Sequence, residues 1–149
     1  MCKRIAARFR KSSGLRKMML AVGLCAITGT PALAEDKPDC NNAMSQSEMT
    51  QCAYLDWQKA DAELNAVYKT AMAKMRETDG YLPDDLKGAA NTLRDAQRAW
   101  IPYRDKACES YGFLARGGTM EPMLVYGCRS DLTSKRIDEL KLLAEGLGN

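Results

Sequence analysis

The chain has 149 residues with 22 Lys and Arg against 19 Asp and Glu, which gives a formal net charge of +3 at pH 7. Seven of the basic residues and none of the acidic ones lie within positions 1–34, so residues 35–149 carry 15 basic and 19 acidic groups, a net charge of −4. Nucleic-acid binding requires a basic face, so we expect no nucleic-acid partner. An acidic domain instead favours a cationic partner.

Residues 1–34 have the three parts of a secretory signal peptide. A basic segment is followed by the apolar run MMLAVGLCAITG and then by TPALA, whose small residues are typical of a signal-peptidase site. The apolar run is too short for a membrane-spanning helix. We therefore predict cleavage after Ala34, a periplasmic or secreted mature chain that is not inserted in the membrane, and one folded domain at 35–149.

The next two segments have the periodicity of amphipathic helices, and we predict helices over about 46–76 and 84–111. The motif SQSE, from Ser45 to Glu48, is a capping box for the first helix. Gly80 and Pro83 mark the turn between the two. Apolar residues recur every three or four positions: Ala53, Trp57, Ala60, Leu64, Val67, Ala71 and Met75 in the first segment, and Leu86, Ala89, Leu93, Ala96, Trp100, Tyr103 and Ala107 in the second.

Written antiparallel, the two apolar stripes match position by position and predict a helical hairpin. Its register places Trp100 opposite Ala60, and a large residue against a small one favours close packing. The same register places Tyr103 opposite Trp57. The side chains of Trp57, Trp100 and Tyr103 are therefore expected to fill a core between the first two helices.

Polar side chains fall beside that core in the same register. Asp56 and Lys106 lie on one flank, where we predict an ion pair. Arg104 lies on the other flank near Tyr54, one turn from Trp100, over whose ring its guanidinium group is expected to lie. Exposed ion pairs contribute about 1 kcal/mol or less, so these contacts are expected to set the register rather than create the fold.

A third helix is predicted over about 120–145. It follows Gly117 and Gly118, which interrupt the chain, and Pro122 suits a first helical turn. Because no segment reads as a strand, we predict an all-α fold, a small antiparallel three-helix bundle. Pro102 lies inside the second helix, where it removes a backbone hydrogen bond, and we interpret it as a tolerated bend on the solvent side.

Four cysteines remain after cleavage: Cys40, Cys52, Cys108 and Cys128. An even number in an oxidising compartment predicts two disulfides. The hairpin register points Cys52 and Cys108 to opposite flanks, so among the possible pairings we favour Cys40–Cys52 with Cys108–Cys128. The third helix should then lie on the flank of Arg104. Because the chain has no histidine and no C-x-x-C motif, we expect neither a metal nor a cofactor.

Three sequence blocks resemble a known family. They are CAYLDWQKADAELNAVYKTAM, then LRDAQRAWIPYRDKACE, and finally GGTM, GC and LTSKRIDEL in that order. With the four cysteines, these blocks are similar to the lysozyme inhibitor LprI-like N-terminal domain family over about residues 40–141. The resemblance implies an exported, helical, disulfide-braced domain, and it implies a lysozyme-type muramidase as the protein partner, which the domain would bind and inhibit.

The inhibitor hypothesis points to one loop as a contact site. A lysozyme cleft carries two carboxylates, which a guanidinium group would fit, and a cationic lysozyme would attract an acidic domain. Arg116, in a loop flanked by glycines, is the candidate probe, with Phe113 and Leu114 as apolar support. The competing interpretation is that Arg116 caps the C-terminus of the second helix.

Other classes of function remain as alternatives. The chain has no histidine, no G-x-S-x-G motif and no phosphate-binding loop, so we do not expect an enzyme. Carboxylates such as Asp56 and Asp61 have the helical spacing of a solvated face. A non-inhibitory binding or scaffold module of the cell envelope is the second hypothesis, with Met120 and Met123 as a docking face. The sequence leaves the oligomeric state open.

Overall fold

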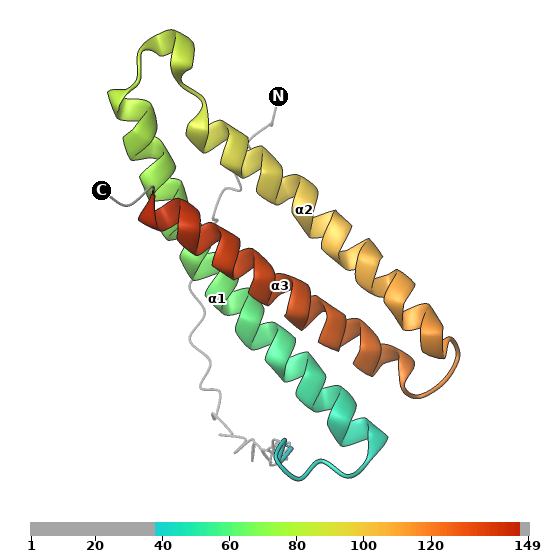
Figure 1. The fold of residues 1–149 in the computed structure, drawn as a ribbon. Helices are drawn as coiled ribbons and strands as arrows, with labels where there is room; N and C mark the ends of the chain where they lie inside the picture. The colour runs from blue at the N-terminus through green and yellow to red at the C-terminus, as the bar shows by residue number, and fades with distance from the viewer. Residues whose placement is uncertain (1–37, 147–149) are drawn as a thin grey trace, which may run out of the picture. The chain divides into compact units, whose positions relative to one another are not determined.

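The computed structural model describes residues 38–146, so the predicted signal peptide and its cleavage site at Ala34 lie outside the described residues. The described chain forms three α-helices: α1 (Gln46–Tyr81), α2 (Ala89–Gly112) and α3 (Glu121–Glu145) (Figure 1). Short 3-10 helices, η1 (Asp84–Leu86) and η2 (Phe113–Ala115), lie in the two connections. No strand occurs within 38–146, and the predicted all-α three-helix fold is confirmed. None of these helices is long and apolar enough to cross a membrane.

α1 begins at the predicted capping box. The Ser45 hydroxyl accepts a hydrogen bond from the Glu48 N–H at 3.2 Å, and the Glu48 carboxylate accepts one from the Ser45 N–H at 2.9 Å. The helix continues past the predicted end at 76 and through Gly80 to Tyr81. It ends there because Leu82, the C-cap, has an extended backbone, and the following Pro83 disfavours a helical conformation at Leu82. The prediction that Gly80 lies in the turn is wrong, since one glycine costs a helix only about 1 kcal/mol.

α2 begins at Ala89 rather than at 84, because η1 occupies the preceding residues and Gly88 has a φ of 139°. Gly88, the N-cap residue, has no side chain with which to cap this helix. The carboxylate of Asp79 in α1 does so instead, accepting hydrogen bonds from the N–H groups of Gly88 and Ala89 at 2.8 Å each and of Ala90 at 3.1 Å. Asp79 therefore links the last turn of α1 to the first turn of α2.

This cap predicts a dependence of stability on acid. The backbone N–H of Gly88, followed by those of Ala90 and Ala89, lowers the pKa of Asp79 from its usual 3.8. A carboxyl whose pKa is lowered on folding stabilises the fold above its unfolded pKa, and this stabilisation is lost as the pH falls through the lower, folded pKa. We expect the thermal midpoint of the wild-type chain, followed by circular dichroism, to exceed that of Asp79→Asn by a few degrees at neutral pH. The difference should shrink below about pH 4.

Asp85→Asn is the matched control, because Asp85 is an exposed carboxylate of the same connection. Its midpoint should follow the wild-type curve at every pH. A difference between Asp79→Asn and wild type that stays constant down to strongly acidic pH would contradict the capping role.

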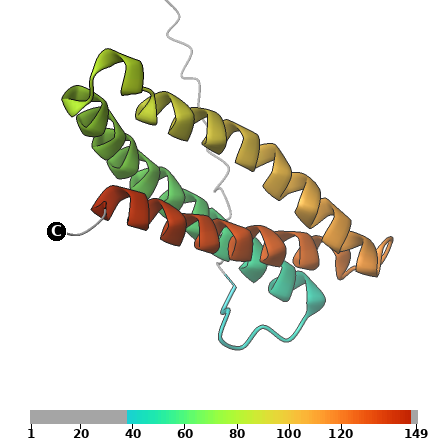
Figure 2. The same ribbon diagram turned by 45° about the horizontal axis from the view of Figure 1, so that its top comes forward.

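α3 packs against both other helices, and its contact with α1 is the most extensive of the three helix pairs (Figures 1 and 2). It ends beside Lys74, so the last turns of α1 and η1 extend beyond it (Figure 1). The buried apolar core is formed by Ala60, Leu64, Ala71 and Met72 from α1, Leu93 from α2, and Ile137 and Leu140 from α3. The core thus lies mainly between α1 and α3, and the prediction of a core formed by the first two helices alone is wrong.

The buried face of α2 also differs from the predicted stripe. Its buried residues are Leu93, Gln97, Arg104, Cys108 and Gly112. Ala96 is exposed, and Tyr103 is 63% exposed, so the prediction that Tyr103 fills the core is wrong. Trp100 is half-buried and packs against the core. α2 buries a different face from the one predicted, because it contacts α3 partly through polar side chains. A pattern of apolar residues cannot identify such a face. Pro102 lies on the exposed side of α2, as predicted.

The predicted ion pair between Asp56 and Lys106 does not form. Lys106 instead binds Glu109, one turn later in α2, with 2.6 Å between Nζ and Oε2. Asp56 is exposed on α1. The physical reason is the position of α3: it packs along α1 more extensively than α2 does, so the flanks of the first two helices do not meet in the predicted register.

Candidate functional site

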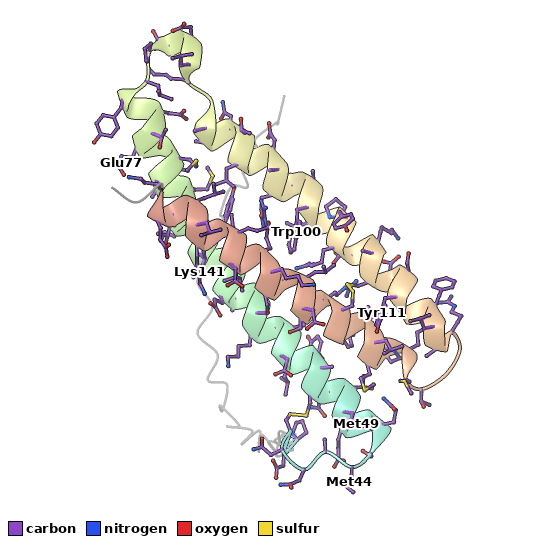
Figure 3. All side chains as sticks on the ribbon, viewed as in Figure 1. Met44, Met49, Glu77, Trp100, Tyr111 and Lys141 are labelled. Carbon is purple, nitrogen blue, oxygen red and sulfur yellow. A yellow bond between two sulfur atoms is a disulfide. The ribbon has the colours of Figure 1, made fainter. Side chains whose placement is uncertain are left out.

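Two disulfides brace the three helices, and both predicted pairings are confirmed. Cys40–Cys52 ties the segment before α1 to its second turn, with 5.6 Å between the Cα atoms (Figure 3). Cys108–Cys128 ties the last turns of α2 to α3, with 5.4 Å between the Cα atoms. The second bridge holds α3 on the flank of α2 that carries Arg104, as expected.

Arg104 joins all three helices at the centre of the bundle. Its side chain is only 6% exposed. Nη1 donates to Asp61 Oδ1 of α1 at 2.9 Å and to Thr133 Oγ1 of α3 at 3.3 Å, and Nε donates to Asp105 Oδ1 at 3.0 Å. The guanidinium carbon lies 5.2 Å from the ring centroid of Trp100, which confirms the predicted cation–π contact. Arg104 is therefore paired with side chains of all three helices through Nε and Nη1.

Two arginines of α3 extend this cluster, and the sequence analysis did not single them out. Arg129 lies over the ring of Trp57 at 5.1 Å, and its Nε is 3.4 Å from Asp105 Oδ1. Arg136 lies over the ring of Trp100 at 6.0 Å and donates from Nε to Gln97 Oε1 at 3.0 Å. These two arginines are seven residues apart and so lie on one face of α3, a spacing that a search for charged stripes would have found.

The guanidinium groups and indole rings of this cluster are directed at one another. Trp57 also stacks on Tyr126 of α3, with ring centroids 5.8 Å apart and planes 17° from parallel. The predicted structural residues Trp57, Trp100 and Arg104 thus meet in a cluster shared by the three helices, rather than in a core of the first two helices. Two buried donors of the cluster, Nε1 of Trp57 and Nε of Arg129, have no hydrogen-bond partner among the described residues. Because Arg104 and Arg136 are paired within the protein, the cluster nevertheless favours a structural role over a binding one.

An exposed tip follows the second disulfide. We define the tip as residues 111–120, which include the end of α2, η2 and the residues before α3. Phe113 and Leu114 are 61% and 75% exposed, and the side chain of Arg116 is 64% exposed. Tyr111, labelled in Figure 3 beside this connection, is also exposed. The structure therefore brings the three predicted contact residues together on one apolar, cationic projection.

The tip is held in place by short-range contacts. The Glu121 carboxylate accepts hydrogen bonds from Arg116 Nη1 at 2.5 Å and from the Gly117 N–H at 2.8 Å. The guanidinium carbon of Arg116 lies 4.6 Å from the ring centroid of Phe113. Gly112 packs so closely on α3 that an added Cβ would lie 2.6 Å from Val125 Cγ2. Arg116 thus pairs with the first turn of α3, and the alternative that it caps the end of α2 is not what the structure shows.

The sequence profile of the family described as lysozyme inhibitor LprI matches residues 39–140. The chain belongs to this family. The match covers both disulfides, α1, α2, the tip and most of α3, and it confirms the resemblance carried by the three sequence blocks. An uncharacterized protein of Rhizobium meliloti (strain 1021) is 48% identical over 139 residues, which cover 91% of this chain and 100% of that protein. No solved structure gives a significant match.

Two carboxylates of α1 in this LprI-family domain are engaged in ion pairs with the other helices, whereas Asp56 is exposed. Asp61 binds Arg104, and Glu63 binds Lys141 of α3 at 3.0 Å. Within residues 38–146 there is no group of three or more His, Cys, Asp or Glu side chains placed to hold a metal ion. The ion pairs of Asp61 and Glu63 therefore connect α1 to α2 and to α3.

The methionines considered as a docking face of the LprI-family domain differ in their surroundings. Met120 is exposed at the edge of the tip. Met123 is half-buried, and its sulfur lies 3.3 Å from Gln46 Nε2 at the start of α1. Only Met120 is thus available to a partner without rearrangement, and it adds to the apolar surface of the tip.

Proposed function

We propose that this domain binds and inhibits lysozyme-type muramidases outside the cytoplasm, and that the tip is the contact site. Membership of a family described as a lysozyme inhibitor supports the activity. The observation that carries the choice of site is the exposure of Phe113 and Leu114 on a segment braced by the Cys108–Cys128 disulfide.

The tip has the properties of a preorganised binding segment. Aromatic residues and arginine provide much of the binding energy at protein interfaces, and apolar anchors such as leucine add buried area. A segment that is already ordered loses less conformational freedom when it binds. Here the disulfide, the close packing of Gly112 and the carboxylate of Glu121 supply that order.

The contribution of Arg116 to binding depends on its ion pair with Glu121 in the free protein. To reach a carboxylate of a muramidase cleft, its guanidinium group has to leave Glu121. Because one ion pair replaces another, the net gain is modest. Phe113 and Leu114, whose side chains are largely in water in the free protein, gain more from burial. We therefore expect the two apolar residues to dominate affinity and Arg116 to orient the tip.

The proposal is tested by lysis of a peptidoglycan suspension by several lysozymes, with and without the oxidised chain 35–149. We expect dose-dependent inhibition that weakens with added salt, because an acidic domain is attracted to a cationic enzyme. The double variant Phe113→Ala/Leu114→Ala should raise the inhibitory concentration by about tenfold or more, and Arg116→Ala by roughly twofold to fivefold.

Tyr103→Ala is the matched control, since Tyr103 is an exposed aromatic residue of α2 outside the tip. It should inhibit within a factor of about two of wild type. If the tip variants inhibit as well as Tyr103→Ala does, the contact site lies elsewhere. If no lysozyme type is inhibited, the alternative of a non-inhibitory binding module of the cell envelope takes the place of the inhibitor.

A further inference from the structure

We propose that a groove between α1 and α2 binds a small amphipathic anion, an acidic oxygen group joined to an apolar body. The groove has a volume of about 470 Å³, and all of its lining residues belong to α1 and α2. Pockets of roughly 300–1,000 Å³ hold small ligands. The groove shares no residue with the tip, so this inference does not depend on the proposed function.

Two arginines of α2 line the groove with unused hydrogen-bonding capacity. The Nε of Arg94 is buried and has no hydrogen-bond partner among the described residues. Its nearest carboxylate oxygen, Oδ1 of Asp95, is 3.7 Å away, which is too long for a hydrogen bond. Arg98 lies one turn later on the same face and is exposed, and no ion pair forms to it within residues 38–146. The Nε of Arg94 is itself covered, but the Arg94 side chain is 43% exposed, so a ligand can reach its terminal nitrogens and the guanidinium group of Arg98.

The third arginine of the groove has a different role. Arg104 lies at its inner side and already binds Asp61 and Asp105. Its charge is therefore compensated within the protein, whereas those of Arg94 and Arg98 are not compensated to the same degree. The groove is a locally cationic surface on a domain whose residues 35–149 carry a net charge of −4. Charge complementarity accordingly favours an anionic occupant.

The chemistry of the walls defines the class of ligand. Guanidinium groups pair with carboxylates and phosphates through two parallel N–H donors. Tyr68 and Leu64 of α1 and Ile101 of α2 supply an apolar surface beside them, and Ile101 is 42% exposed in the free protein. A ligand that places its acidic group on Arg94 and Arg98 and its apolar body on Ile101 and Tyr68 would satisfy both surfaces.

Titration followed by ¹H–¹⁵N NMR on the oxidised chain 35–149 tests this proposal. The probes are N-acetyl-leucine, which carries a carboxylate, phenyl phosphate, which carries a phosphate ester, and N-acetyl-leucinamide, which matches the first probe without its charge. We expect at least one anion to shift the resonances of Tyr68, Arg94 and Ile101 with a Kd on the order of 1 mM. The neutral amide should bind about tenfold more weakly or not at all. Which anion binds more tightly identifies the acidic group.

The matched variants are Arg94→Gln/Arg98→Gln and Arg76→Gln, the latter removing an exposed arginine of α1 that does not line the groove. The double variant should weaken binding of the anion about tenfold or more, and the control should bind within a factor of about two of wild type. Equal binding of the acid and the amide, an unchanged affinity in the double variant, or no shift with either anion at about ten times the expected Kd would overturn the proposal.

Discussion

Replacing Arg104 with Ala is expected to lower the free energy of unfolding by about 3 kcal/mol, because it removes a buried guanidinium group that pairs with two partly exposed carboxylates and packs on two indole rings. The guanidinium group contacts Asp61, Asp105 and Thr133, and all three lose a hydrogen-bond donor together. The indole rings of Trp57 and Trp100 lose the cation that lies 5.7 Å and 5.2 Å from their centroids. Urea unfolding followed by tryptophan fluorescence measures the change through the midpoint.

Two further substitutions separate charge from packing. Arg104→Met restores a long apolar side chain, and replacing a buried charge by an apolar group of similar size is often tolerated better than deleting it. Arg104→Met should therefore lower the free energy of unfolding by less than Arg104→Ala does. Arg98→Ala, which removes an exposed arginine from the same helix, should change the free energy of unfolding by about 0.5 kcal/mol or less. If Arg104→Ala is as stable as Arg98→Ala, the cluster is not a structural centre.

The elements that could be predicted from the sequence are those set by local chemistry. The capping box at Ser45 fixes the start of α1, and the glycines before Pro122 separate α3 from α2. The predicted disulfide pairing is also confirmed, although the hairpin register used to argue for it is wrong. Both bridges join cysteines that are near each other in sequence, 12 and 20 residues apart, so the pairing does not depend on the exact register of the helices.

The register of the helices could not be predicted, because the buried face of α2 includes Gln97 and Arg104. An apolar pattern favours Ala96 and Tyr103 instead, and both are exposed. The partners that make the polar face acceptable in the interior, Thr133 and Arg136 of α3, are distant in sequence. Burial of polar groups is possible only once those partners are in place, and so it is a property of the folded structure.

Part of the candidate contact site could be predicted from the sequence, and part could not. The sequence predicts a loop with Phe113, Leu114 and Arg116, and the structure places all three at the exposed tip. The role of Glu121 could not be predicted, since it depends on the turn at Gly117, where φ is 78°. This turn brings the N–H of Gly117 within 2.8 Å of the Glu121 carboxylate. The charge of Arg116 is thereby partly neutralised in the free protein, which the sequence alone does not reveal.

Replacing both Cys108 and Cys128 with Ser should lower the free energy of unfolding by about 3 kcal/mol, since this bridge closes a segment of 20 residues and limits the freedom of the unfolded chain. The bridge also joins α2 to α3 directly before the tip. The tip of the double variant should therefore be less ordered in the free protein. It would then lose more conformational freedom on binding, which weakens the affinity. We expect inhibition of lysozyme to weaken about tenfold at a temperature where the variant remains folded.

The double variant Cys40→Ser/Cys52→Ser is the matched control, because it removes a bridge that closes a segment of 12 residues at the start of α1 and includes no residue of the tip. The residues before α1 contribute nothing to the buried core, so they gain freedom in the folded as well as in the unfolded state. The expected loss of stability is accordingly about 1 kcal/mol, and inhibition should be unchanged. Both variants are compared by urea unfolding and by the peptidoglycan assay. Equal weakening of inhibition by the two variants would mean that general stability, and not order at the tip, determines binding.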